Sequence, residues 1–92
     1  MNNKKVRKFL EKQGFVDHPA EKHKMILHFN SRGGLIVFEC GSSYEVILGY
    51  LADDITPELI FSDVTEKTLI ERFDSMKKIS TELFAKLLSE NY

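Results

Sequence analysis

Apolar residues near the N-terminus recur at the spacing of an α-helix. Val6, Phe9 and Leu10 stand at i, i+3 and i+4, with Lys and Glu elsewhere around the helix. This pattern predicts one amphipathic helix over residues 4–13, with a single apolar stripe turned toward a core. Gly14 follows where a left-handed C-cap costs least, so the helix is expected to end just before it.

The pattern changes to that of β-strands after an expected loop over residues 17–22. Three segments, 24–30, 35–40 and 44–51, either alternate apolar with polar positions or are densely apolar, and short turns containing Gly and Ser separate them. Because short loops join neighbouring strands, these segments are expected to form an antiparallel meander of three strands.

The middle segment is apolar on both of its faces. Leu35 and Val37 fall on one face, and Ile36 and Phe38 fall on the other. This pattern is typical of a central strand that is covered on both sides. The sequence leaves open whether the same chain covers both faces, or whether helices cover one face and a partner chain the other.

Helical spacing returns in the last third of the chain. Residues 56–58 read Thr-Pro-Glu, an N-cap followed by proline, and predict a short helix or irregular turn that continues through Phe61. Asp63, with Glu66 three residues later, is similar to a capping box. The apolar spacing that follows predicts a helix over residues 64–78.

The C-terminal residues allow two interpretations. Ser80 or Thr81 can cap a further helix through Leu88, or the preceding helix runs on without a break to about Ser89. The element order predicts an α+β fold: a three-stranded antiparallel sheet with an N-terminal helix and two C-terminal helices. We expect a single domain over residues 1–92, because 92 residues build only one core.

Composition places the chain among ordinary folded domains. Its hydrophobic content is 42% and its aromatic content 11%, more than a disordered chain carries. No apolar run approaches the roughly 20 residues that a membrane-spanning helix needs. The basic N-terminus is not followed by a long apolar segment, and Cys40 is the one cysteine, so a reducing, cytoplasmic location is expected.

The formal net charge of −1 conceals a polarised chain. Residues 1–32 hold eight Lys or Arg and three acidic residues, whereas residues 39–74 hold nine acidic residues and two Lys or Arg. If folding keeps the two groups apart, the protein offers a charged partner a directional field. If folding mixes them, the asymmetry means only a well-solvated surface.

Catalytic and metal-binding patterns are weak. The soft metal ligands are His18, His23, His28 and Cys40, and their spacing matches no zinc module, so neither a metal nor a cofactor is expected. A nucleophile pair of Cys40 and His28 lacks a third group to orient it. The adjacent carboxylates at 53–54 have no glycine-rich, phosphate-binding loop beside them. We therefore expect no enzyme activity.

Two charged surfaces remain as candidate binding sites. The first helix can track phosphates through its basic residues, which are Lys4, Lys5, Arg7, Lys8 and Lys12. A row of carboxylates can instead stand in for a phosphate backbone and occupy a basic groove on another protein. The residues predicted to form that acidic, partner-binding surface are Asp53, Asp54, Glu58, Asp63, Glu66, Glu71 and Asp74.

The first half of the chain resembles HicA-type toxins in its layout. A basic helix that ends in Gly14, followed by a strand containing a histidine and two more strands, is similar to that family. The resemblance implies a fold like that of double-stranded-RNA-binding domains and cleavage of mRNA by a histidine. The family's Gly-Ser-His-His sequence is Glu-Lys-His-Lys at residues 21–24, so only His23 carries over.

The whole chain resembles, in length and in its Lys-, Glu-, Ile-, Phe- and Asn-rich style, the Arn family of anti-restriction proteins from T-even bacteriophages. The resemblance implies a DNA mimic that blocks a restriction nuclease specific for modified cytosine and a histone-like nucleoid protein. DNA mimics are usually strongly acidic overall. With a net charge of −1, mimicry here depends on residues 39–74 alone.

The sequence thus predicts a non-enzymatic interaction protein, a phage early inhibitor of a host DNA-binding or defence protein that acts through the acidic surface. The alternatives are a small nucleic-acid-binding domain that uses the basic helix, and a HicA-like, mRNA-cleaving toxin that uses His23. The strands carry more apolar surface than short helices can cover, so we also predict a homodimer that pairs sheet faces or C-terminal helices.

Overall fold

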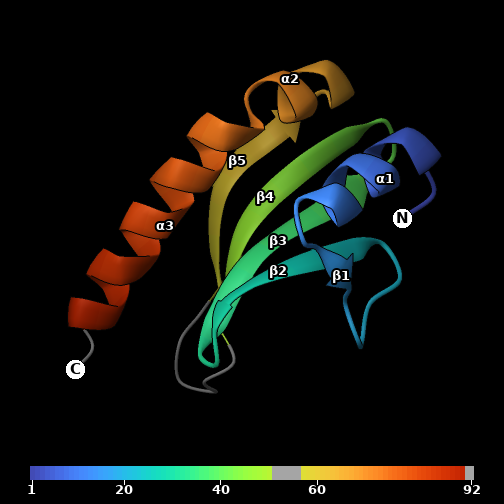
Figure 1. The fold of residues 1–92 in the computed structure, drawn as a ribbon. Helices are drawn as coiled ribbons and strands as arrows, with labels where there is room; N and C mark the ends of the chain where they lie inside the picture. Colours follow the sequence, from blue (N-terminus) through green and yellow to red (C-terminus); the bar gives the residue numbers. More distant parts are fainter. Residues whose placement is uncertain (51–56, 91–92) are drawn as a thin grey trace.

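A five-stranded antiparallel sheet forms the centre of the protein, with the strands in chain order from β1 to β5 (Figure 1). The computed structural model describes residues 1–50 and 57–90. The prediction of a three-stranded sheet is wrong, because one further strand precedes the expected three and another follows them. The strands are β1 (Val16–Asp17), β2 (Lys24–Asn30), β3 (Gly33–Cys40), β4 (Ser43–Tyr50) and β5 (Glu58–Val64).

Both additional strands lie at the edges of the sheet, where sequence patterns are weakest. β1 has two residues, too few to show alternation, and it forms because Val16 pairs with Ile26 of β2. β5 replaces the helix or turn predicted around residues 57–61. Two register shifts interrupt its pairing with β4, so its apolar residues do not alternate regularly.

The first helix confirms its prediction to within one residue. α1 spans Lys4–Lys12, and the side chain of Asn3 caps it by accepting the backbone N–H groups of Lys5 and Val6 at 3.0 and 3.1 Å. Gly14 follows with a φ of +100°, a conformation that glycine adopts without the strain of a side chain. The chain then turns into β1.

The C-terminal helices break at a different place from the one predicted. α2 spans Glu66–Glu71 and α3 spans Phe73–Glu90, so the break falls at Arg72 and the predicted helix over 64–78 is two helices. Ser80 does not cap a helix. It lies fully buried inside α3, where its hydroxyl donates to the carbonyl of Met76 at 2.7 Å.

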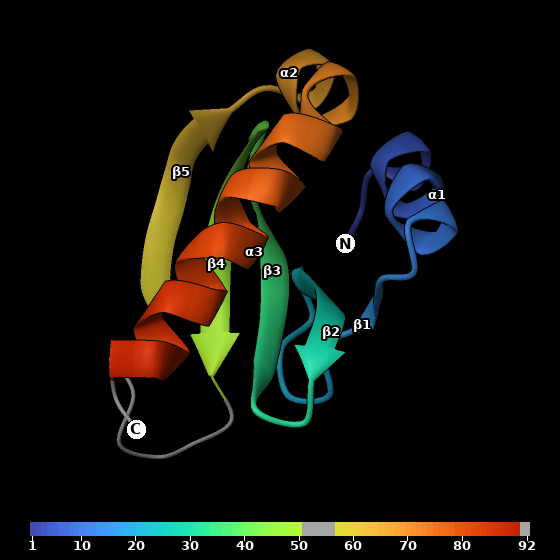
Figure 2. The ribbon, with the colours of Figure 1, turned by 60° about the vertical axis from the view of Figure 1, so that its left-hand side comes forward.

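All three helices pack on one face of the sheet (Figures 1 and 2). Residues from every helix and from the helix-facing side of the strands form the core between the two layers. α3 crosses the sheet obliquely (Figure 2). β3 lies third of five strands, so the prediction that it is central is confirmed. Buried members of this core include Val6, Leu10, Leu35, Val37, Val46, Leu48, Leu69, Phe73 and Phe84.

The other face of the sheet carries an apolar row that crosses all five strands. The pairing register aligns its members from edge to edge. The two ends of the row are the most exposed, with 53% of Val16 and 54% of Leu59 open to solvent, whereas its second and third members are buried. The row consists of Val16, Ile26, Ile36, Ile47 and Leu59.

No helix in the described part of the chain has both the length and the apolar character needed to cross a membrane.

Candidate functional site

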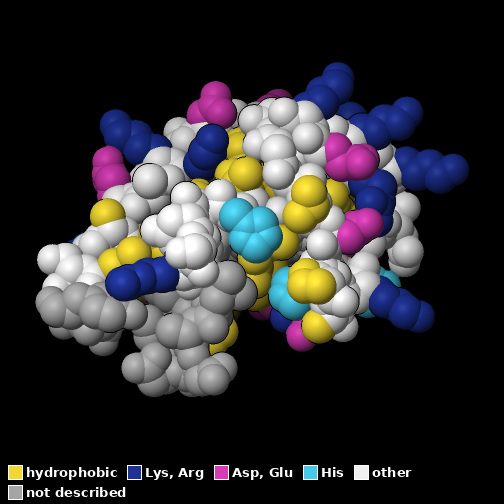
Figure 3. Space-filling view, turned by 60° about the horizontal axis from the view of Figure 1, so that its bottom comes forward, with side chains coloured by type: hydrophobic (Ala, Val, Ile, Leu, Met, Phe, Trp, Pro, Cys, Tyr) yellow, Lys and Arg dark blue, Asp and Glu magenta, His cyan; other side chains and the backbone are white. Residues whose placement is uncertain are grey.

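The strongest concentration of one charge lies on α1. Its lysines fall within an arc of about 100° around the helix axis, on the side opposite the buried Val6 and Leu10. Lys and Arg side chains project from the right-hand end of the molecule in Figure 3, the end that carries α1 in Figure 1. We call this group, all of it exposed, the lysine face: Lys4, Lys5, Lys8 and Lys12.

Few acids neutralise the lysine face. Lys5 reaches the carboxylate of Glu66 at 3.8 Å, and 74% of its side chain still lies in solvent. Within residues 1–50 and 57–90, no ion pair engages the other three lysines. Arg7 differs from them, because it pairs with Asp17 at 2.8 Å and this hydrogen bond raises the pKa of the guanidinium further. Arg7 therefore fastens α1 to β1 instead of facing a partner.

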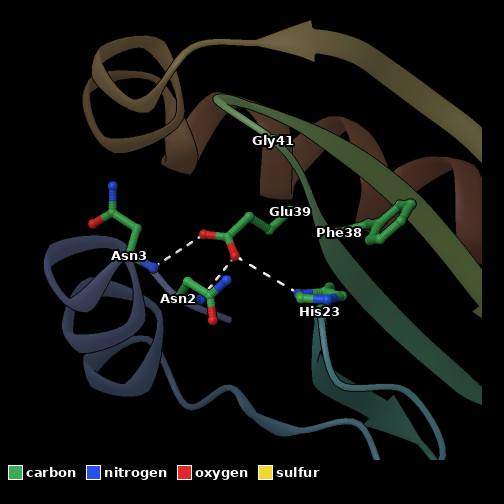
Figure 4. A pocket seen from close by; sticks show the side chains of 6 residues that line it. All are labelled: Asn2, Asn3, His23, Phe38, Glu39 and Gly41. Carbon is green, nitrogen blue, oxygen red and sulfur yellow. Dashed lines mark hydrogen bonds and ion pairs between the residues drawn. The ribbon is translucent and has the colours of Figure 1, made fainter.

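An open hollow of about 590 Å³ lies at the N-terminal end of α1, where the helix meets β3 (Figure 4). Its volume falls within the range of ligand-binding pockets. The backbone N–H groups of Asn2 and Asn3 face the Glu39 carboxylate, the Asn3 side chain points away from it, and His23 lies across from them (Figure 4). The residues that line the hollow are Asn2, Asn3, His23, Phe38, Glu39 and Gly41.

Glu39 forms the floor of the hollow and is the one carboxylate among the residues that line it. Only 6% of its side chain is exposed. One carboxylate oxygen accepts the backbone N–H of Asn2 at 2.7 Å, and the other accepts that of Asn3 at 3.0 Å. Hydrogen bonds of this kind compensate for burying a charge. Glu39 therefore fixes the residues that lead into α1 against the central strand.

His23 stands at the rim of the same hollow. Its Nδ1 lies 3.9 Å from the Glu39 carboxylate, which makes an ion pair when the imidazole is protonated, and 53% of its side chain is exposed. The backbones also meet, because the N–H of Glu39 donates to the carbonyl of His23 at 2.9 Å. The residue carried over from the HicA-type pattern thus lies beside a buried acid.

The predicted acidic surface does not come together as one row. Asp53 and Asp54 lie outside the described residues. Glu58 and Asp63 occupy opposite ends of β5, about 17 Å apart for an extended strand. Glu66 is partly used inside the protein, because it accepts the side-chain amide of Asn3 at 2.6 Å. The exposed acids that remain near α2 are Asp63, Glu71 and Asp74, with the basic Lys67 and Arg72 among them.

The soft metal ligands are likewise dispersed. His18 is engaged within its own loop, where it accepts the backbone N–H of Ala20 at 3.1 Å. Cys40 lies at the end of β3, where burial is the main reason why the pKa of its thiol is raised. The described part of the chain contains no group of three or more His, Cys, Asp or Glu that could hold a metal ion.

Sequence reasoning missed the hollow and counted Glu39 only as one of many acids. One signal was present: Glu39 continues the alternation of Leu35 and Val37 on the buried face of β3, where a charge requires partners. The partners proved to be the backbone N–H groups of Asn2 and Asn3, 37 and 36 positions away, and no sequence pattern predicts hydrogen bonds between residues so far apart.

Comparisons with known proteins identify no relative: no family model, no curated protein and no solved structure matches the chain. The likenesses to HicA-type toxins and to the Arn family therefore stay hypotheses.

Proposed function

We propose that this protein binds nucleic acid through the lysine face of α1. The observation that carries the proposal is the gathering of Lys4, Lys5, Lys8 and Lys12 on one exposed arc of a helix. Cations that neutralise phosphates release the counterions condensed on a nucleic acid, and this release drives binding without reading sequence. Lys4 and Lys8, and likewise Lys8 and Lys12, are about 6 Å apart along the helix axis, so several can engage one strand.

The lysine face supports this function better than the acidic residues support DNA mimicry. The lysines adjoin one another on one helix, and one ion pair touches them among the described residues. The acids are divided between two ends of β5 and the region of α2, with basic side chains among them. A continuous charged surface attracts an opposite charge more strongly than an interrupted one.

The test compares two triple substitutions that remove the same charge from different helices. Changing Lys4, Lys8 and Lys12 to Gln should weaken binding to short DNA and RNA strands. It should also make the plot of log affinity against log salt shallower, by about 0.7–0.9 for each phosphate that a lysine no longer neutralises. Fluorescence anisotropy across a salt series measures both effects.

The matched control changes Lys77, Lys78 and Lys86 of α3 to Gln, positions that are also exposed. It should leave the salt slope as it is. Equal decreases in affinity for the two triple variants, or an absence of binding by the unaltered protein at low salt, would disprove the proposal.

The second candidate is inhibition of a basic host DNA-binding or defence protein, as a phage early protein would achieve it in the host cytoplasm. It is favoured by the exposure of Asp63, Glu71 and Asp74 around α2, where no ion pair within the described residues engages them. Reversing these three acids to Lys should then abolish capture of a basic nucleoid protein, measured by pull-down. Capture that survives the reversal excludes this function.

A further inference from the structure

We infer that the hollow beside α1 accepts one unpaired nucleobase that carries an exocyclic amino group, while the flanking phosphates lie on the lysines around it. This inference rests on the proposed function and makes it more specific, because it restricts the ligand to single-stranded nucleic acid that contains adenine, cytosine or guanine.

The charges around the hollow favour a base over a phosphate. The floor is the Glu39 carboxylate, which repels an anion but still offers lone pairs beyond the two that Asn2 and Asn3 use. A carboxylate accepts hydrogen bonds from the exocyclic amino group of a base, as it does from cytosine in DNA grooves. Thymine and uracil have no such amino group, so they are expected to bind less tightly.

The remaining lining suits the flat shape and polar edge of a base. The imidazole of His23 stands at the rim and is half exposed, and His is among the side chains on which unpaired bases stack. The exposed side chain of Asn2 offers both a donor and an acceptor to the edge of a base. The ring of Phe38 lies on the opposite side of β3 from Glu39, where the ammonium of Lys24 stands 5.2 Å from its centroid, so it is not part of the surface that contacts the base.

Positive charge flanks the hollow on two sides. Asn3 is followed directly by Lys4 and Lys5 of the lysine face, and His23 is preceded directly by the exposed Lys22. A strand that places one base above Glu39 therefore finds lysines for the phosphates before and after that base. The hollow is open to solvent, as it must be when the ligand is one unit of a longer chain.

Short homopolymers of about ten nucleotides test this inference. At fixed salt, adenine and cytosine strands should bind about fivefold or more tightly than thymine strands, and a duplex should bind no better than thymine. Substituting Asn2→Ala together with His23→Ala should weaken the binding of adenine and cytosine strands, because the base loses its stacking and edge contacts, and should leave the salt slope unchanged. Both side chains are exposed, so the fold should persist, which circular dichroism verifies.

The control is His28→Ala, another exposed histidine on β2 that does not line the hollow. It should keep the preference. If adenine, cytosine and thymine strands bind alike and the Asn2/His23 variant matches the unaltered protein, the inference is wrong, although binding that depends on the lysine face still stands. If no strand binds at low salt, the proposed function fails and this inference fails with it.

Discussion

The two longer helices, α1 and α3, pack on the same face of one sheet but differ in what they present to solvent. The outward positions of α3 alternate in sign at intervals of four residues, so neighbouring charges compensate one another. Those positions are Asp74, Lys78, Glu82 and Lys86. The outward positions of α1 are lysines, with the exposed Glu11 as the one acid beside them. Exposure to solvent alone therefore does not produce an excess of one charge on a helix. The excess of positive charge on α1 indicates a negatively charged partner.

The helices differ equally in how they are attached. α3 is held by apolar packing, including the Phe84 ring, which lies 5.3 Å from that of Phe29 and so close to Gly33 that a Cβ there would come within 3.1 Å of the ring. α1 is held by apolar packing at Val6 and Leu10 and, in addition, by the buried carboxylate of Glu39. The polar attachment places the start of the lysine face next to the hollow.

Loss of the Phe84 ring should have the largest effect on stability. Only 4% of this residue is exposed, and Phe84→Ala should lower the free energy of unfolding by about 3–5 kcal/mol, because the ring leaves a cavity that the sheet cannot fill. Urea denaturation measures the change. Ile79→Ala on the same helix is the control, because 49% of Ile79 is exposed, and it should cost much less. Similar costs at both positions would contradict apolar attachment of α3.

Removal of the buried carboxylate tests the polar attachment of α1. Glu39→Ala should lower the free energy of unfolding by about 2–3 kcal/mol, because two backbone N–H groups lose their acceptor. Glu39→Gln keeps one carbonyl oxygen and should lose less. Glu71→Ala removes an exposed acid and should change stability by no more than about 0.5 kcal/mol. If Glu39→Ala is as mild as Glu71→Ala, the carboxylate does not anchor α1.

Alkaline pH should loosen the same end of the protein. The pKa of Tyr44 is raised mainly by burial, and then by the negative charges of Glu39 and Glu66, while a hydrogen bond with Asn3 acts in the opposite direction. A phenol whose pKa is higher in the folded state contributes stability that is complete below its unfolded pKa of about 10 and is lost as the pH rises through the folded pKa.

The measurement is chemical denaturation at a series of pH values above about 9, with Tyr44→Phe alongside. The variant should lose stability less steeply as the pH rises, because it has no phenol to ionise. Parallel curves for the variant and the unaltered protein would show that Tyr44 does not govern the alkaline loss.

The smallest expected effect concerns the sheet face that the helices leave uncovered. Pairing of two such faces remains a prediction, and it would bury the exposed ends of the apolar row, Val16 and Leu59. Light scattering should then give twice the chain mass of 10.6 kDa, and Leu59→Lys should return the mass to that of one chain without changing the fold. A single-chain mass for the unaltered protein at tens of micromolar would refute the dimer.

The sequence by itself determined the elements whose evidence is local. The stripe of Val6, Phe9 and Leu10 predicted α1 and its buried side, because helical periodicity follows from backbone geometry alone. The lysines of α1 therefore had to lie on the opposite, exposed side. The two-sided apolar character of β3 likewise identified the central strand. Both features repeat over one element and need no knowledge of distant residues.

Only the tertiary structure decided the sheet edges, the helix break and the hollow. β1 is a strand because it pairs with β2, and β5 because it pairs with β4, although neither has a regular alternation of its own. Glu39 became an anchor instead of a surface acid because folding brought Asn2 and Asn3 to it from 37 and 36 positions away. Pairing register and buried hydrogen bonds join residues that are remote in sequence, so a local pattern carries no record of them.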